Sequence, residues 1–272
     1  MSLCILGLRS RDCGRSRAAA HLIGAALIVG ISASWADAGQ QESSNLSDGG
    51  PPSSAAVRCL LITGEDYPGH KWQETAPVLV EALSQGGKIR VEVLDKLAEM
   101  ERVDWSRYDT VVMHFKNYDP KVPGRAAFDG LDRFVKNGGG LVLVHFACGA
   151  FQEFKDDFEK LAGRVWDPSL RGHDPHGAFR VVIVDPEHPV TKGLKDFETV
   201  DELYTCLSGE TSIHVLAQAV SRVDGRVYPI AFTLNAGKGR VFHCVLGHDV
   251  QALRNSHVQE LYRRACLWTA GR

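Results

Sequence analysis

Short apolar runs alternate with amphipathic stretches from Val57 onwards. The first run, VRCLLITG at 57–64, is largely apolar, as in a strand buried on both faces of a sheet. The stretch ETAPVLVEALSQGG at 74–87 has helical spacing and ends at a glycine pair, a helix stop signal. The same alternation predicts further strands at 89–95, 108–115, 141–147, 179–185, 213–220, 227–234 and 239–246, and further helices at 125–140, 153–163 and 257–270.

This alternation predicts an α/β fold. Continuously apolar strands separated by helices are typical of a mostly parallel central sheet in a three-layer sandwich. A flavodoxin-like strand order would make the first, third and fourth strands neighbours. Ligands of such sheets bind beyond the carboxyl ends of the strands, so the polar residues that follow each strand are the candidates for a site.

Two segments precede this domain. Four arginines, the apolar run AAAHLIGAALIVGISAS and the triplet ADA at 36–38 predict a secretory signal peptide over 1–38. An uncleaved anchor is the alternative, although the run is shorter than the ~20 apolar residues of a membrane span. Residues 39–56 are rich in Gly, Ser and Pro and predict a flexible linker. We expect one domain over 57–272, exported to the periplasm or the extracellular space, without stable membrane insertion after cleavage.

Composition excludes several classes of protein. A hydrophobic content of 44% and a charged content of 24% are those of an ordinary globular protein. Loss of 1–38 removes four arginines and two aspartates and moves the formal charge from -2 to -4. No basic stripe remains, so we expect no nucleic-acid partner. The sequence has no Cys-x-x-Cys pair, which argues against a cysteine-rich zinc site.

Polar side chains follow the first, third and fourth predicted strands. His70 and Trp72 follow the first, and an indole face stacks on a pyranose while an imidazole exchanges hydrogen bonds with hydroxyls. The alternative is that Trp72 packs at a helix start and His70 caps it. Asn117 follows the third strand. His145 ends the fourth, where an unmade hydrogen bond would cost ~1–3 kcal/mol; it is either a site residue or a core histidine bonded to a loop.

The loop RGHDPHG at 171–177 places His173 and His176 three residues apart between glycines. Imidazoles are common ligands of zinc, so the pair is a candidate for metal binding. Direct sugar contact and a purely structural polar loop are the alternatives. Glu202, in VDELY, is either a general acid or base or the anchor of a loop through a salt bridge.

Six motifs occur in one order: GHKWQET, GGGLVLVH, GHDPHG, EHPVTKGL, DELY and GKGRVFHCVLGHD. Together they resemble the ThuA-like (trehalose-utilisation) family of the class I glutamine amidotransferase-like superfold, from about Val57 to Gly271. The resemblance implies a carbohydrate, keto sugars included, without a settled reaction. Glutaminases of the superfold carry a nucleophilic cysteine where this chain has His145, with Cys148 three residues further on. Their downstream histidine position resembles His248.

We therefore expect an exported enzyme, of hydrolase or isomerase type, that acts on a trehalose-like disaccharide or a keto sugar by acid–base or metal-assisted chemistry. The candidates are His145, His248 and Glu202 for catalysis, His70, Trp72, Asn117 and Asp249 for substrate binding, and His173 and His176 for metal binding. The expected cofactor is a divalent metal such as zinc, and no nucleotide. A non-catalytic carbohydrate-binding module and a Cys148-dependent hydrolase or glutaminase are the alternatives.

Overall fold

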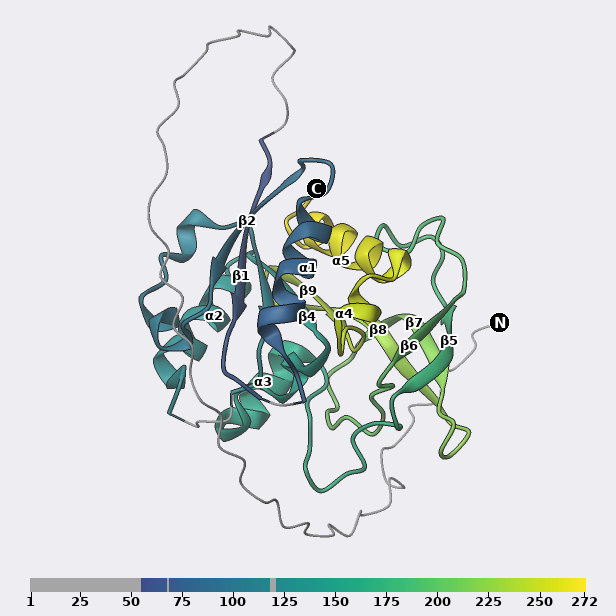
Figure 1. Ribbon diagram of the computed structural model, residues 1–272. Helices are drawn as coiled ribbons and strands as arrows, with labels where there is room; N and C mark the ends of the chain where they lie inside the picture. Colours follow the sequence, from purple (N-terminus) through teal and green to yellow (C-terminus); the bar gives the residue numbers. More distant parts are fainter. Residues whose placement is uncertain (1–54, 68, 118–120) are drawn as a thin grey trace, which may run out of the picture.

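The computed structural model describes residues 55–67, 69–117 and 121–272 (Figure 1). The predicted signal peptide at 1–38 and nearly all of the predicted linker at 39–56 lie outside these residues. One nine-stranded sheet has the order β2-β1-β3-β4-β9-β8-β7-β5-β6. The strands are β1 (Val57–Thr63), β2 (Ile89–Leu94), β3 (Thr110–His114), β4 (Gly140–Val144), β5 (Gly177–Ile183), β6 (Phe197–Asp201), β7 (His214–Val220), β8 (Val227–Ala236) and β9 (Gly239–Cys244).

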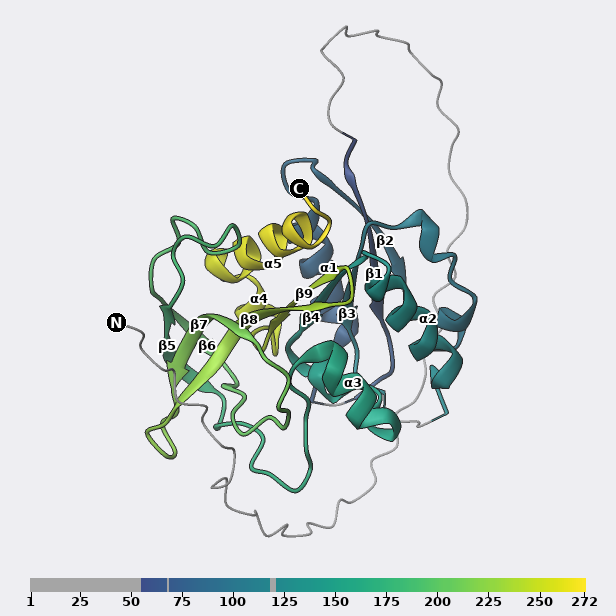
Figure 2. The ribbon, with the colours of Figure 1, turned by 180° about the vertical axis from the view of Figure 1, so that it is seen from behind.

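The sheet is mixed, with two unlike halves. β2, β1, β3, β4 and β9 pair in parallel, and the β1, β3 and β4 neighbourhood is that of a flavodoxin-like order. β9, β8, β7, β5 and β6 pair antiparallel and extend to one side (Figures 1 and 2). The prediction of a mostly parallel sheet is wrong because the links at 221–226 and 237–238 are too short for the crossover that parallel pairing requires.

Helices cover both faces of the parallel half. α1 (Trp72–Ser84) and α5 (Ser256–Thr269) lie on one face, and α2 (Gly124–Lys136) and α3 (Lys155–Ala162) lie on the other. The buried side chains form two clusters accordingly. Leu61 belongs to the cluster that includes α1 and α5, and its neighbour Leu60 to the cluster that includes α2 and α3. Both faces of these strands are therefore buried, which explains their continuously apolar sequence.

Three elements differ from the predicted ones near the places where the site forms. The strand predicted at 141–147 ends at Val144, and His145–Gly149 forms a 3-10 turn. β6 was not predicted, because FETVD is a short edge strand with alternating burial and two acidic residues instead of an apolar run. The four-residue helix α4 (Val250–Leu253) was not predicted either.

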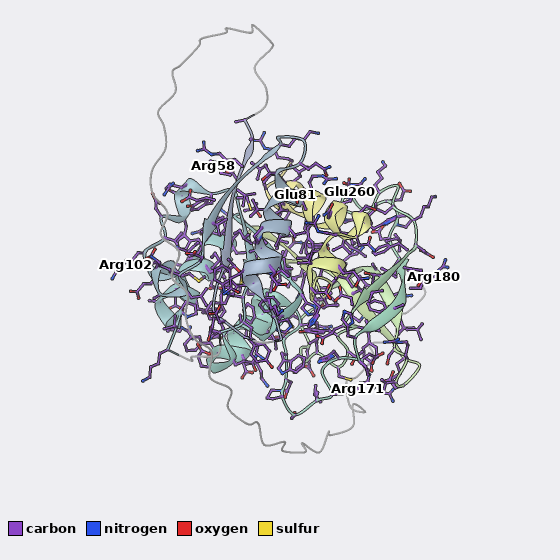
Figure 3. The ribbon with its side chains drawn as sticks, viewed as in Figure 1. Arg58, Glu81, Arg102, Arg171, Arg180 and Glu260 are labelled. Carbon is purple, nitrogen blue, oxygen red and sulfur yellow. The ribbon has the colours of Figure 1, made fainter. Side chains whose placement is uncertain are left out.

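The outside of the domain is polar. Charged side chains such as Arg58, Arg102 and Arg180 lie around the periphery of the ribbon (Figure 3). Of the helices in the described ranges, none is long and apolar enough to span a bilayer.

Candidate active site

Four side chains converge beside the sheet. His70, His145, Glu202 and His248 each offer a ligand-type atom, and these four atoms lie within 4.8 Å of one another. The residues follow β1, β4, β6 and β9 respectively. The successive antiparallel pairings from β9 to β6 bring β6 back to the direction of β9. All four strands therefore present their carboxyl ends to the same side, where α/β sheets bind ligands.

His145 stands on a left-handed turn directly after β4, with φ of 46°. A non-glycine residue in this conformation costs roughly 1–2 kcal/mol. Its Nδ1 lies 2.7 Å from the carbonyl oxygen of Val245. Because a carbonyl only accepts, Nδ1 carries a proton, and in the neutral imidazole Nε2 then carries the lone pair. That Nε2 is buried, has no hydrogen-bond partner and lies 3.7 Å from Glu202 Oε2.

Glu202 lies nearer to His248 than to His145. His248 Nδ1 lies 3.1 Å from Glu202 Oε2, although the two atoms are not aligned as a hydrogen bond. Burial opposes ionisation of Glu202, but His145 and His248 outweigh it and hold the pKa of this carboxyl well below its usual range. Burial also opposes protonation of His248, and Glu202 reverses this and raises the pKa of the imidazole. Each partner thus favours the charged form of the other.

Asp201 connects the backbones of this pair. It is fully buried at the end of β6. Its Oδ1 accepts the backbone N–H groups of Glu202 (2.8 Å) and His248 (3.1 Å), and its Oδ2 accepts that of Gly247 (2.7 Å). One carboxylate therefore joins the end of β6 to the turn that follows β9, and this contact brings two site residues from distant parts of the chain together.

His70 lies between two aromatic rings. The ring of Phe146 stacks on it at 4.4 Å and 18°, and that of Tyr67 at 5.6 Å and 27°. Its Nε2 lies 3.5 Å from the hydroxyl of Tyr204, and its Nδ1 is buried without a hydrogen-bond partner. Burial, and then the neighbouring histidines, lower the pKa of His70 to about 2. The ring is therefore neutral, which is the form that binds metals.

His173 and His176 flank the four-residue group but are not part of it. Buried Asp174 fixes their loop by accepting from Ser221 Oγ (2.9 Å) and the backbone of Arg222 (2.7 Å). His173 Nδ1 lies 2.8 Å from the carbonyl of Asp174. His176 Nε2 instead lies 3.3 Å from Asp249 Oδ2, and its side chain is 37% exposed. The side chains close enough to share an ion thus differ from the pair that the loop sequence suggested.

The other substrate-binding candidates lie outside the four-residue group. Trp72 begins α1 and donates its Nε1–H to Asp66 at 2.8 Å, while its ring packs on the core. Asn117 is buried and accepts the backbone N–H of Phe151 at 2.6 Å. Asp249 caps α4 with its carboxylate. These contacts give each side chain a structural task, and their roles in substrate binding stay predictions.

Cys148 does not resemble an active nucleophile. Its side chain is fully buried in the core near His145. Burial raises the pKa of the thiol to about 12. The thiolate that a cysteine nucleophile requires is therefore strongly disfavoured at neutral pH, which argues against the Cys148-dependent hydrolase.

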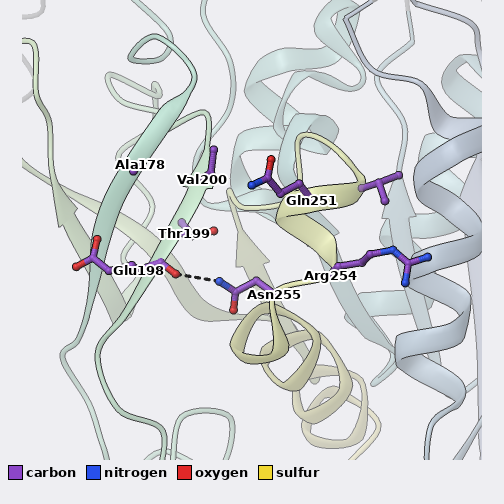
Figure 4. Close-up of a pocket in the computed structure, with 8 residues that line it drawn as sticks. Ala178, Glu198, Thr199, Val200, Gln251, Arg254 and Asn255 are labelled. Carbon is purple, nitrogen blue, oxygen red and sulfur yellow. Dashed lines mark hydrogen bonds between the residues drawn. The ribbon is translucent and has the colours of Figure 1, made fainter.

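A surface pocket lies between the strands β5 and β6 and the junction of α4 with α5 (Figure 4). It is lined by Ala178, Glu198, Thr199, Val200, Val250, Gln251, Arg254 and Asn255. Gln251 and Asn255 point towards β6, and Asn255 Nδ2 donates to the carbonyl of Glu198 at 3.0 Å. None of the four converging residues lines this pocket, although its walls adjoin Asp201 and Asp249 in sequence.

The sequence pattern did not identify three residues that shape the site: Asp201, Tyr204 and Tyr67. Tyr204 packs between His145, at 4.3 Å between ring centroids, and His173, at 5.6 Å. The signal available for Asp201 and Tyr204 was their place in DELY beside Glu202. Tyr67 lies in EDYPGHKWQET, in which the sequence suggested Trp72 as the aromatic contact for a sugar.

The fold and the site define an α/β protein with a histidine and glutamate centre at the carboxyl edge of a mixed sheet. The ThuA family model, described as trehalose utilisation, matches residues 58–269. The chain belongs to this family, which confirms the resemblance found in its motifs.

Solved structures share this fold. A ThuA-like protein from Parabacteroides merdae is 27% identical with a TM-score of 0.70, over 79% of this chain and 90% of the other. A ThuA-like protein from Bacteroides uniformis is 18% identical with a TM-score of 0.63, over 82% and 95%. A Salmonella typhimurium protein described as cytoplasmic is 16% identical with a TM-score of 0.56, over 78% and 99%. A search of curated proteins finds no significant match.

Proposed function

We propose that this chain is a metal-dependent enzyme that acts on a carbohydrate at the four-residue group. The proposal rests on three imidazole nitrogens that have no aligned hydrogen-bond partner. His70 Nδ1, His145 Nε2 and His248 Nδ1 are buried without aligned hydrogen-bond partners, beside a carboxylate held in its charged form. A buried polar atom left without a partner costs ~1–3 kcal/mol. A divalent cation that binds these atoms would remove that cost.

The residues fit such an ion chemically. Imidazole nitrogen and carboxylate oxygen are ligands of zinc and similar divalent metals. The contact between His145 Nδ1 and the carbonyl of Val245 fixes the tautomer that leaves Nε2 available. Metal-binding histidines in proteins are usually oriented in this way by a second partner. His70, His145, Glu202 and His248 would hold the ion, which would act as a Lewis acid towards an oxygen of the substrate.

The side chains around the group supply the remaining functions. His173 Nδ1 faces the carbonyl of Asp174, so its Nε2 keeps the lone pair and can take a proton from a substrate hydroxyl and return it. Its neighbour Tyr204 is buried and stacks on it, with 5.6 Å between the ring centroids. If the group holds no ion, the charged pair of Glu202 and His248 would itself provide acid–base chemistry, as the sequence suggested.

Carbohydrate is the proposed substrate class because the family model is described as trehalose utilisation. We propose a trehalose-like disaccharide or a keto sugar, whose oxygens would exchange hydrogen bonds with the polar groups of the site. We further propose export of the protein, on the basis of the leader-like residues 1–38. Mass spectrometry of the mature amino terminus, after expression in a bacterium, tests cleavage near Ala38.

Metal binding by single variants tests the site. Chelator-treated protein is titrated calorimetrically with Zn²⁺ and Mn²⁺, as wild type, Glu202→Gln, His145→Ala and His176→Ala. We expect one ion per chain in the wild type. Loss of a ligand should weaken binding at least ~100-fold, since loss of an orienting partner alone costs 10–100-fold. His176→Ala is the matched control, because its ring lies beside the group without joining it.

The outcomes separate the alternatives. Negligible metal in all four proteins would end the metal proposal, and loss of metal in His176→Ala alone would move the site to the loop at 171–177. Incubation of the metal-loaded protein with disaccharides and their keto forms, followed by mass spectrometry, tests catalysis. Binding of sugar without any product would identify a non-catalytic carbohydrate-binding module instead.

A further inference from the structure

Tyr67 is an exposed aromatic ring at the rim of the histidine group. Its side chain is 43% exposed. In the described part of the chain, the other exposed large hydrophobic side chains are all valines. An aromatic ring that stays in contact with solvent beside such a group offers an apolar face to another molecule. This ring lies directly against His70, one of the four converging residues.

The position of the ring is fixed by its neighbours. The backbone N–H of His70 donates to the carbonyl of Tyr67 at 3.0 Å, which closes a tight turn. Gly69 lies beneath the ring, and a Cβ atom at this position would come within 2.6 Å of Tyr67 Cε1. A larger residue at this position would therefore displace the ring from its place against His70. A ring held in this way loses little conformational freedom when a ligand binds, which favours affinity.

We propose that Tyr67 is the platform on which a neutral sugar ring stacks at this site, an inference that rests on the proposed carbohydrate function. A pyranose has an apolar face of C–H groups and an edge of hydroxyls. The aromatic face of Tyr67 suits the first, and the imidazoles and carboxylate beside it suit the second. Trp72, which the sequence suggested for this role, is partly buried and has its Nε1–H bound to Asp66.

The assignment explains the arrangement of aromatic rings around His70. Phe146 stacks on His70 at 4.4 Å and is 5% exposed, so it belongs to the core. Tyr67 stacks on the same ring at 5.6 Å and remains in contact with solvent. Only Tyr67 of these two presents a surface to an incoming ligand, and that surface adjoins the atoms of the proposed reaction.

Two substitutions at one position test the proposal. Wild type, Tyr67→Ala and Tyr67→Phe, each loaded with Zn²⁺, are titrated with glucose, trehalose, maltose and lactose by calorimetry. Tyr67→Ala should raise the Kd of the sugars that bind by about tenfold, which corresponds to ~1.4 kcal/mol and lies at the upper end of what an aromatic contact contributes. Tyr67→Phe keeps the ring and should leave the Kd within about twofold of wild type. Zinc stoichiometry and Tm should be the same in all three proteins.

The outcomes distinguish this inference from the proposed function. Equal sugar affinity in wild type and Tyr67→Ala overturns the platform alone, and the carbohydrate function then stands. A loss in Tyr67→Phe as large as in Tyr67→Ala also overturns the platform, because it assigns the effect to the hydroxyl. Failure of the wild type to bind any sugar of the set overturns both proposals.

Discussion

Replacing Asp201 by asparagine tests how the site is assembled. The buried carboxylate accepts three backbone N–H groups, two on Oδ1 and one on Oδ2. Asparagine keeps one acceptor oxygen but places an amide NH₂ group where the other oxygen was. At least one backbone donor, for example that of Gly247, then faces another donor at the end of β6. The change is nearly isosteric, so packing should be little affected.

The expected loss follows from these contacts. A hydrogen bond to a charged group contributes ~1.5–3 kcal/mol, and an unpaired buried N–H costs ~1–3 kcal/mol. Removal of the charge offsets part of this loss in free energy, since burial raises the pKa of Asp201 and opposes its ionisation. We expect a net loss of about 2 kcal/mol in the free energy of unfolding. For a domain of this size, that lowers Tm by roughly 4–8 °C.

Urea unfolding and zinc titration measure the two effects of this substitution. Zinc affinity should fall by ~10–100-fold, as for other residues that orient metal ligands, because Glu202 and His248 lose their common anchor. Asp196→Asn is the matched control. Asp196 also accepts a backbone N–H, from Ile183 at 2.9 Å, but its side chain is 32% exposed, so its loss should cost less than ~1 kcal/mol.

Wild-type stability in Asp201→Asn would refute the role of this carboxylate in holding the fold together. Unchanged zinc affinity in a variant that is destabilised as expected would refute its role in orienting the site. An equal loss of unfolding free energy in Asp196→Asn would show that burial of the carboxylate does not determine the size of the loss.

Two further predictions follow from buried or paired groups elsewhere. Burial raises the pKa of Cys148 to about 12, so iodoacetamide at pH 8 should modify it only after unfolding in guanidinium; peptide mapping that finds rapid modification of the native protein would contradict its burial. Although burial opposes ionisation of Asp224, hydrogen bonds from Tyr228 and the backbone of Arg226 lower its pKa to about 2. A lowered pKa stabilises the fold above the ordinary value near 4 and loses this effect as the pH falls towards 2. Asp224→Asn should therefore lose less stability than the wild type between pH 4 and pH 2 in urea unfolding, and parallel losses would count against the assignment.

The parallel half of the sheet could be predicted from the sequence because its strands are buried on both faces. The strand Gly140–Val144, for example, is apolar at every position after its glycine. β6 could not be predicted in this way. It is an edge strand in which Glu198 faces solvent and Asp201 turns inward, so burial alone does not produce an apolar run. Its identity depends on pairing with β5, which the local sequence does not encode.

Some residues of the site could be predicted from the sequence and others could not. His145 and His248 could be predicted because each follows a strand, and the ends of such strands meet at one edge. Asp201 could not, since its role lies in accepting the backbone N–H of Gly247, which is 46 positions away. Trp72 shows the opposite case: its residue type suggested a sugar contact, but Asp66, six residues earlier, binds its indole N–H. Such contacts through space decide which polar residue is available to a ligand.

The order in which the converging residues occur along the chain has a consequence for synthesis. His70 and His145 follow β1 and β4, early in the chain, whereas Glu202 and His248 follow β6 and β9, near its end. A nascent chain that has left the ribosome only as far as β5 holds two of the imidazoles and no carboxylate of the group. A ligand that binds all four residues therefore stabilises the completed sheet and not its earlier intermediates. Bound ligand would slow unfolding of the finished protein without speeding the formation of β1 to β4.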